Sequence, residues 1–167
     1  MSQYFTLFQL EERFDIDVST LEQTYHALAA RFHPDKFAAA STFDQKQAMM
    51  MASTINEAYR ILRNPTDRAA YLLQQKGIDA DAPEHTSYAP EFLMQQMEWR
   101  ETLEEARAEK NQTRLNDLQT EIATAQQKLY NLLKTAFIEE QYDDAAKYVR
   151  QSRFLDKLYN EIQIALS

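Results

Sequence analysis

The feature that most constrains this chain is its glycine content, because Gly77 is the only glycine in 167 residues. Phosphate-binding loops, dinucleotide-binding turns and the nucleophile elbow of hydrolases each need two or more glycines in a short stretch. The chain also lacks the Asn-Gly and Asp-Gly pairs that mark tight hairpins. Alanine, the best helix former, occurs 22 times, whereas valine occurs twice. We therefore expect an all-α protein.

The composition excludes several kinds of chemistry. Cysteine is absent, so the chain itself can form no disulfide, thiolate zinc site or cysteine-held iron–sulfur cluster. The three histidines stand far apart, and we expect no metal site and no cofactor. A net charge of −8 argues against a nucleic-acid partner. No apolar run approaches membrane-spanning length and no signal peptide is evident, so we expect a cytoplasmic protein without a membrane partner.

The chain divides at a segment of turn residues. Gly77 follows Lys76, as expected where a helix ends in a basic last turn, and two prolines follow within 13 residues. We therefore expect an N-terminal domain over 1–76, a linker over 77–90 and a C-terminal domain over 91–167. Residues 1–80 carry 8 basic and 10 acidic side chains, and residues 81–167 carry 10 and 16. The acidity is concentrated in the second half.

Four helices are expected in the first half, spanning about residues 4–10, 19–32, 42–62 and 65–76. The second is expected to begin with a capping box over Ser19–Glu22, and the third with another over Thr42–Gln45. Asn64 supplies an N-cap for the fourth helix, and Pro65 suits its first position.

Three longer helices are expected in the second half, over about residues 90–110, 113–138 and 143–167. Short connections between them predict antiparallel neighbours and a three-helix bundle. On the last helix, Leu155, Leu158 and Ile162 lie in one apolar stripe. Phe154 lies about 100° away from that stripe. It is therefore either exposed or in contact with a neighbour at the edge of the bundle.

The helix over 90–110 has two distinct faces at about 100° per residue. One face is apolar and is assigned to the core: Phe92, Trp99, Leu103 and Ala106. Apolar side chains with an acidic rim fall opposite the core or beside it: Leu93, Met94, Met97, Glu98, Glu101 and Glu105. Methionine is common on adaptable recognition surfaces. The alternative is that the leucine and the methionines pack locally against the first domain or the linker.

A proline corner, His33-Pro34-Asp35-Lys36, directly follows the second expected helix. Proline cannot continue a helix and disfavours helical backbone in the residue before it. The corner presents a rigid carboxylate beside an imidazole. The tripeptide alone is also compatible with an ordinary turn, since proline and aspartate are common turn residues.

The sequence around this corner resembles the J-domain family. Three segments in the right order carry the resemblance: Tyr4-Phe-Thr-Leu-Phe8, Tyr25-His-Ala-Leu-Ala-Ala-Arg-Phe-His-Pro-Asp-Lys36, and Ile55-Asn-Glu-Ala-Tyr-Arg-Ile-Leu62, followed by Pro65 and Arg68-Ala-Ala-Tyr71. The resemblance implies an antiparallel helical hairpin with short helices over residues 1–76. It also implies docking on a DnaK-class chaperone and stimulation of its ATPase.

The resemblance further implies which residues would meet the chaperone ATPase: Arg31, His33, Pro34, Asp35 and Lys36. Asp35 would be offered to an arginine of the ATPase, a strong and oriented pairing. The chain departs from the family pattern at three positions. His26 and Ala27 stand where many J-domains have basic residues, which weakens the expected electrostatic steering. Gln9 stands where many relatives have glycine, and we expect the fold to tolerate it.

The chain as a whole resembles the HscB family, J-protein co-chaperones of bacterial iron–sulfur cluster assembly. Further segments carry this resemblance: His33-Pro-Asp-Lys-Phe-Ala38, Tyr71-Leu-Leu73, Glu91-Phe-Leu-Met94 and Arg153-Phe-Leu-Asp-Lys-Leu158. It implies a monomer whose J-domain meets the chaperone HscA and whose bundle binds the scaffold protein IscU. The scaffold-binding residues that it implies are Leu93, Met94, Met97, Glu98, Glu101, Glu105 and Phe154.

Two other functions are alternatives to the co-chaperone function that the resemblance implies. A general J-protein for unfolded clients is the first alternative, but such proteins often carry Gly/Phe-rich or cysteine-rich regions, which this chain lacks. A small enzyme using His33 and Asp35 is the second. These residues lie two apart in an exposed corner with no evident nucleophile or oxyanion donor, so we expect no enzymatic activity.

Overall fold

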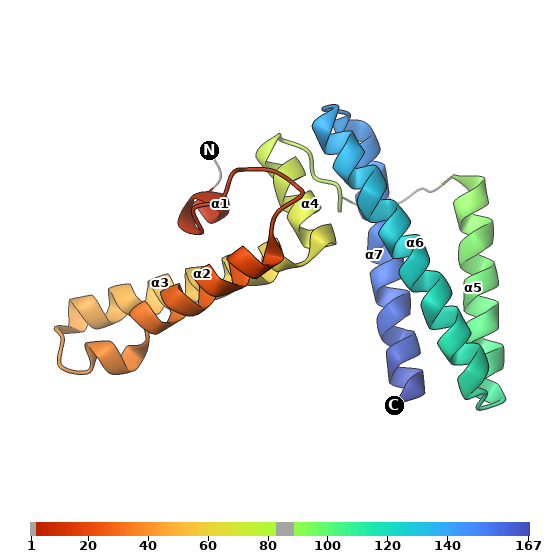
Figure 1. Cartoon of the computed structure of the whole chain (residues 1–167), viewed down its shortest axis with the longest axis horizontal. Coiled ribbons are helices and arrows are strands. Elements are labelled where there is room, and N and C mark those ends of the chain that lie inside the picture. Colours follow the sequence, from red (N-terminus) through yellow and green to blue (C-terminus); the bar gives the residue numbers. More distant parts are fainter. Residues whose placement is uncertain (1–2, 83–88) are drawn as a thin grey trace. The chain divides into compact units, whose positions relative to one another are not determined.

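The computed structural model describes residues 3–82 and 89–167. Within these ranges every regular element is a helix and none is a strand, which confirms the all-α prediction. The chain forms two compact units, Met1–Gly77 and Ile78–Ser167 (Figure 1). Residues 83–88, most of the second half of the expected linker, lie outside the described residues. None of the described helices is long and apolar enough to cross a membrane.

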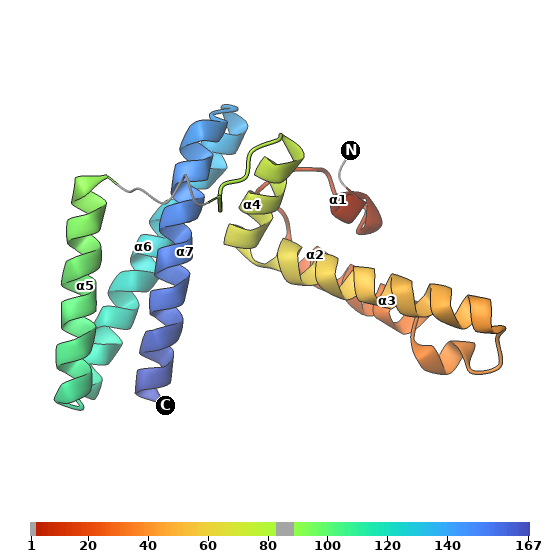
Figure 2. The same ribbon diagram turned by 180° about the vertical axis from the view of Figure 1, so that it is seen from behind.

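The first unit contains a long helical hairpin with shorter helices packed on it. Its elements are α1 (Gln3–Leu7), α2 (Val18–Arg31), the 3-10 helix η1 (Pro34–Phe37), α3 (Thr42–Arg63) and α4 (Pro65–Gln75). Helices α2 and α3 run antiparallel, and η1 lies in the turn that joins them (Figures 1 and 2). Tyr25 of α2 stacks on Tyr59 of α3 with ring centroids 3.9 Å apart. Its hydroxyl also donates to the side-chain carbonyl of Asn56 at 2.9 Å.

A buried arginine connects α4 with the rest of this unit. Arg68 donates from Nε to the carbonyl of Phe14 at 2.6 Å and from Nη1 to the carbonyl of Leu62 at 2.7 Å. Its guanidinium also lies 5.0 Å from the centre of the Phe14 ring. Charge-assisted bonds to buried carbonyls hold the segment between α1 and α2 against the end of α3.

Helices α2 and α3 are capped by other residues than the predicted capping boxes gave. Asp17, and not Ser19, caps α2, because its carboxylate accepts the backbone N–H groups of Ser19 and Thr20. Ser41 caps α3 one residue before the predicted Thr42, with its hydroxyl accepting the N–H of Asp44. The predicted cap at Asn64 is confirmed, because its side chain accepts the N–H of Asp67.

Helix α1 is shorter than predicted. It ends at Leu7, because Gln9 adopts a left-handed backbone with φ of +56°. The N–H of Gln9 bonds to the carbonyl of Thr6, and the N–H of Leu10 bonds to that of Phe5, as at a helix C-terminus that ordinarily uses glycine. The fold accommodates glutamine where many J-domains have glycine.

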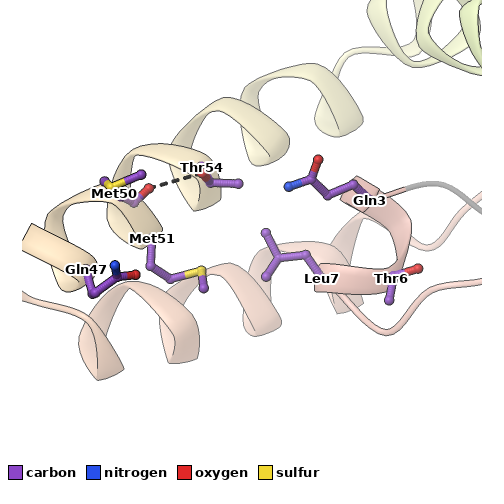
Figure 3. Close-up of a pocket in the computed structure, with 7 residues that line it drawn as sticks. All are labelled: Gln3, Thr6, Leu7, Gln47, Met50, Met51 and Thr54. Carbon is purple, nitrogen blue, oxygen red and sulfur yellow. Dashed lines mark hydrogen bonds between the residues drawn. The ribbon is translucent and has the colours of Figure 1, made fainter. Parts of the chain in front are cut away.

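A groove of about 530 Å³ lies between α1 and α3 (Figure 3). Its lining is apolar or neutral: Gln3, Thr6, Leu7, Gln47, Met50, Met51 and Thr54. Met51 lies in the wall of this groove and is 36% exposed.

The second unit contains three helices, α5 (Pro90–Ala108), α6 (Gln112–Ile138) and α7 (Tyr142–Leu166), each within a few residues of its predicted bounds. Buried side chains from all three form one core: Trp99, Leu103, Ala106, Leu115, Leu118, Ile122, Leu129, Leu155, Leu158 and Ile162. The pairing of α6 with α7 is the most extensive (Figure 1). The predicted three-helix bundle is confirmed.

Both turns of the bundle use a left-handed residue that is not glycine. Lys110 follows α5 with φ of +52°, and Glu140 follows α6 with φ of +57°. In each turn the N–H of the left-handed residue and the N–H of the residue after it donate to carbonyls of the preceding helix. Left-handed backbone costs a non-glycine residue about 1–2 kcal/mol.

We expect Glu140→Gly to raise the free energy of unfolding by about 0.5–1 kcal/mol, since relief of the left-handed backbone exceeds the added entropy of the unfolded chain. Urea unfolding of the full chain measures this change. Glu140→Gln is the matched control, because it removes the charge and keeps the backbone restriction. An equal gain in both variants would assign the effect to charge at the end of α6.

Candidate functional site

The His-Pro-Asp corner is held by its own side chains. His33 is the N-cap of η1, and its Nδ1 accepts the backbone N–H of Asp35 at 3.2 Å. Pro34 occupies the first position of η1, where its missing N–H leaves no bond unmade. The carboxylate of Asp35 lies 3.6 Å from the imidazole and its side chain is 93% exposed. The corner thus presents a carboxylate to solvent on a fixed backbone.

Gln45 of α3 holds this loop by hydrogen bonds, and the sequence analysis did not identify it as a functional residue. Its side-chain Nε2 donates to the carbonyls of Phe37, Ala38 and Ala40 at 3.1, 3.3 and 3.4 Å. The sequence prediction placed Gln45 in a capping box with Thr42. Its side chain instead closes the turn after η1, so it is a positioning residue for the corner.

We expect Gln45→Ala to lower the free energy of unfolding by about 0.5–1 kcal/mol, because the exposed loop carbonyls exchange their side-chain donor for water. Amide exchange in the loop should accelerate. Gln47→Ala is the matched control, since Gln47 is an exposed glutamine of the same helix that only lines the groove. Equal stability of the two variants would show that the carbonyls need no side-chain donor.

The basic residues near the corner are few. The guanidinium of Arg31 lies 5.3 Å from the centre of the Phe32 ring, and Lys36 is exposed in η1. On the same helix as Arg31, His26 faces Glu22 at 3.7 Å. The part of α2 before Arg31 therefore offers little positive charge, and weak electrostatic steering stays a prediction.

The face of α5 opposite the core is exposed, as the helical periodicity predicted. Leu93, Met94 and Met97 are 43, 64 and 71% exposed, and Glu98 and Glu101 are exposed beside them. These side chains are therefore not part of the bundle core. We call them, together with Glu105, the α5 surface. Their role in binding a scaffold protein stays a prediction.

Phe154 is not an exposed side chain. It is half-buried between α7 and α5, where its ring stacks near Trp99 at 6.3 Å and meets Phe92 edge to face at 5.9 Å. The guanidinium of Arg100 lies 5.4 Å from the ring centre. Of the two interpretations left open by the sequence, the contact at the edge of the bundle is correct. In that position Phe154 packs against the N-terminal half of α5. A direct contact of Phe154 with a partner stays a prediction.

The three glutamates of the α5 surface have different surroundings. Glu98 accepts a long bond of 3.5 Å from Gln95, and Glu101 has no ion pair within the described part of the chain. Glu105 instead pairs with Arg114 of α6 at 3.0 Å. The bond to Glu105 raises the pKa of Arg114.

The described residues contain no group of three or more histidine, aspartate or glutamate side chains placed to hold a metal ion. The two exposed surfaces instead offer shape, charge and apolar area, which are the properties of protein-binding sites.

Family models match both units of the chain. A DnaJ domain model matches residues 3–71, and a model described as the HSCB C-terminal oligomerisation domain matches residues 89–163. An antiparallel hairpin with an exposed His-Pro-Asp corner, together with this match, defines the chain as a J-domain protein.

Full-length relatives narrow the class further. The co-chaperone protein HscB homolog of Neisseria meningitidis serogroup B (strain MC58) is 68% identical over 166 residues, covering 99% of this chain and 100% of that protein. The homolog of Azoarcus sp. (strain BH72) is 41% identical, covering 98% of this chain and 93% of that protein. The chain belongs to the HscB family of co-chaperones.

Solved structures agree with this assignment. The chaperone HscB from Vibrio cholerae superposes with a TM-score of 0.87 at 36% identity, covering 98% of this chain and 96% of that one. The human co-chaperone protein HscB has a TM-score of 0.89 and covers 98% of this chain and 82% of that one. Its identity of 23% makes this a likeness of fold alone.

Proposed function

We propose that this co-chaperone binds an IscU-like iron–sulfur scaffold protein on its C-terminal bundle and delivers it to an HscA-like DnaK-class chaperone in the bacterial cytoplasm. The J-domain stimulates the ATPase of that chaperone, which then holds the scaffold and assists cluster transfer to other proteins. Membership of the HscB family supports the co-chaperone part of this proposal.

The observation that carries the proposal is the presence of two exposed surfaces on separate units of one chain. The corner at His33, Pro34 and Asp35, with Arg31 and Lys36 beside it, is proposed to meet the ATPase. The α5 surface, together with Phe154 of α7, which packs against α5, is proposed to bind the scaffold protein. Joining two contacts through one protein raises the effective concentration of each partner near the other.

Steady-state ATP hydrolysis by the chaperone tests the proposal directly. We expect the full chain to raise the rate, the scaffold alone to raise it modestly, and both together to raise it more than the product of the separate effects. Lack of stimulation by the chain would contradict the ATPase role. Equal binding of unfolded reporter peptides and scaffold would favour a general J-protein.

The protein is proposed to act as a monomer, although the family model that matches residues 89–163 is described as an oligomerisation domain. Light scattering during size-exclusion chromatography measures the mass in solution. A mass near 19.6 kDa is expected, and a concentration-independent mass of twice that value would contradict the proposal.

A further inference from the structure

Arg114 joins the start of α6 to the end of α5. Its Nη2 lies 3.0 Å from a carboxylate oxygen of Glu105, and its Nη1 lies 3.4 Å from one of Glu109. The backbone N–H of Arg114 donates to the side chain of Asn111, the N-cap of α6. The guanidinium of Arg114 is therefore shared by two carboxylates across the connection between α5 and α6. Of these two, Glu105 belongs to the α5 surface and Glu109 does not.

This pairing changes the charge that the α5 surface presents. Glu98 and Glu101 have no cationic partner in the described part of the chain, whereas the charge of Glu105 is compensated. A cationic side chain of a partner that approaches Glu105 is repelled by the like charge of Arg114, which lies 3.0 Å from that carboxylate. The second carboxylate, Glu109, can keep the guanidinium paired if Glu105 turns to a partner, so release of Glu105 leaves no unpaired charge on α6.

We propose that Arg114 is an internal competitor for Glu105, which restrains the α5 surface and lowers its affinity for the basic side chains of a scaffold partner. The inference rests on the proposed function, because it concerns the same surface. Arg114 thus lowers the affinity of the α5 surface without belonging to the contact itself. A partner must either displace Arg114 from Glu105 or bind through Glu98, Glu101 and the apolar side chains alone.

The chain offers a matched control at the same end of α5. Arg107 pairs with Glu104 at 3.3 Å, three residues apart on one helix, and within the described residues it forms no ion pair with Glu98, Glu101 or Glu105. Arg107→Gln and Arg114→Gln change the net charge equally. An effect of Arg114 alone therefore reports the pairing with Glu105 and not the overall charge.

The experiment measures the Kd of the full chain for an IscU-type scaffold protein at low and high salt. We expect Arg114→Gln to tighten binding about two- to fivefold at low salt, the range of an exposed ion pair, and to steepen the salt dependence. Arg107→Gln should tighten it less, and Arg114→Lys should behave as the unmodified chain. In a Glu105→Gln background, Arg114→Gln should tighten binding no more than Arg107→Gln does, because only the change in net charge remains.

Several outcomes would overturn the inference. Equal effects of Arg107→Gln and Arg114→Gln would reduce it to net charge. Weaker or unchanged binding of Arg114→Gln, with an unchanged melting temperature, would show that Arg114 does not compete. If Arg114→Gln melts early, Arg114→Met provides the same charge removal with an apolar stem that can pack on the helix. A scaffold that does not bind the unmodified chain at all would contradict the proposed function itself.

Discussion

Replacing Asp35 by asparagine is expected to abolish stimulation of a DnaK-class ATPase while leaving the J-domain folded. Asparagine keeps the shape of the side chain and removes the charge, so an arginine of the ATPase loses its charge-assisted partner. Loss of a central charged contact costs about 2 kcal/mol or more, which corresponds to about a 30-fold loss of affinity. Single-turnover and steady-state ATP hydrolysis measure the effect.

The variant should keep its stability, because the side chain is 93% exposed and, among the described residues, its carboxylate pairs only with the imidazole of His33. Asp44→Asn is the matched control. Asp44 is an exposed aspartate in the first turn of α3, close to the same end of the hairpin, and its replacement changes the charge equally. Stimulation that survives in Asp35→Asn, or that falls equally in both variants, would sink the proposed role of the corner.

Replacing Met97 and Glu101 together by alanine is expected to weaken scaffold binding by at least about tenfold. Burial of one methionine side chain contributes about 1.5–3 kcal/mol, and 1.4 kcal/mol corresponds to about a tenfold change in Kd. Because Met97 is 71% exposed and Glu101 is exposed, the bundle should melt as before. Stimulation of the ATPase by the variant alone should persist, and only the additional effect of the scaffold should disappear.

A double variant outside the α5 surface controls for the loss of an exposed methionine and an exposed glutamate. Met49→Ala with Glu139→Ala removes a methionine that is 66% exposed and an exposed glutamate at the C-terminal end of α6. Its Kd should match that of the unmodified chain. If the first double variant binds as tightly as this control, the scaffold site lies elsewhere and the role of the corner is unaffected.

Helices were predictable because their ends and faces are written in local residues. Asn64 and Pro65 mark the start of α4 as a side-chain cap followed by a residue without an N–H. The starts of α2 and α3 were misplaced by one or two residues, because several neighbouring side chains can cap. Asp17 and Ser41 lie just before the residues chosen from the sequence, and only the backbone geometry decides between such candidates.

The candidate site was predictable only where it depends on a single helix. Exposure of Met94 and Met97 follows from helical periodicity, since one face of α5 is buried. Phe154 is surrounded by Trp99 and Phe92, which belong to another helix. The periodicity of α7 alone therefore could not predict these contacts. Gln45 and Arg114 act across turns on groups that are distant in the helical pattern, so no local signal marks them.

The exposure of the side chains proposed to bind partners has a practical consequence for interpreting natural variants. Asp35, Met97 and Glu101 contribute almost nothing to packing, so changes at these positions leave melting temperature, expression and cellular abundance near normal. Screens that rank variants by folding would therefore pass the most damaging ones. Under the proposed function, such a variant also keeps the other surface intact, so in a mixed population it would bind one partner without delivering it to the other.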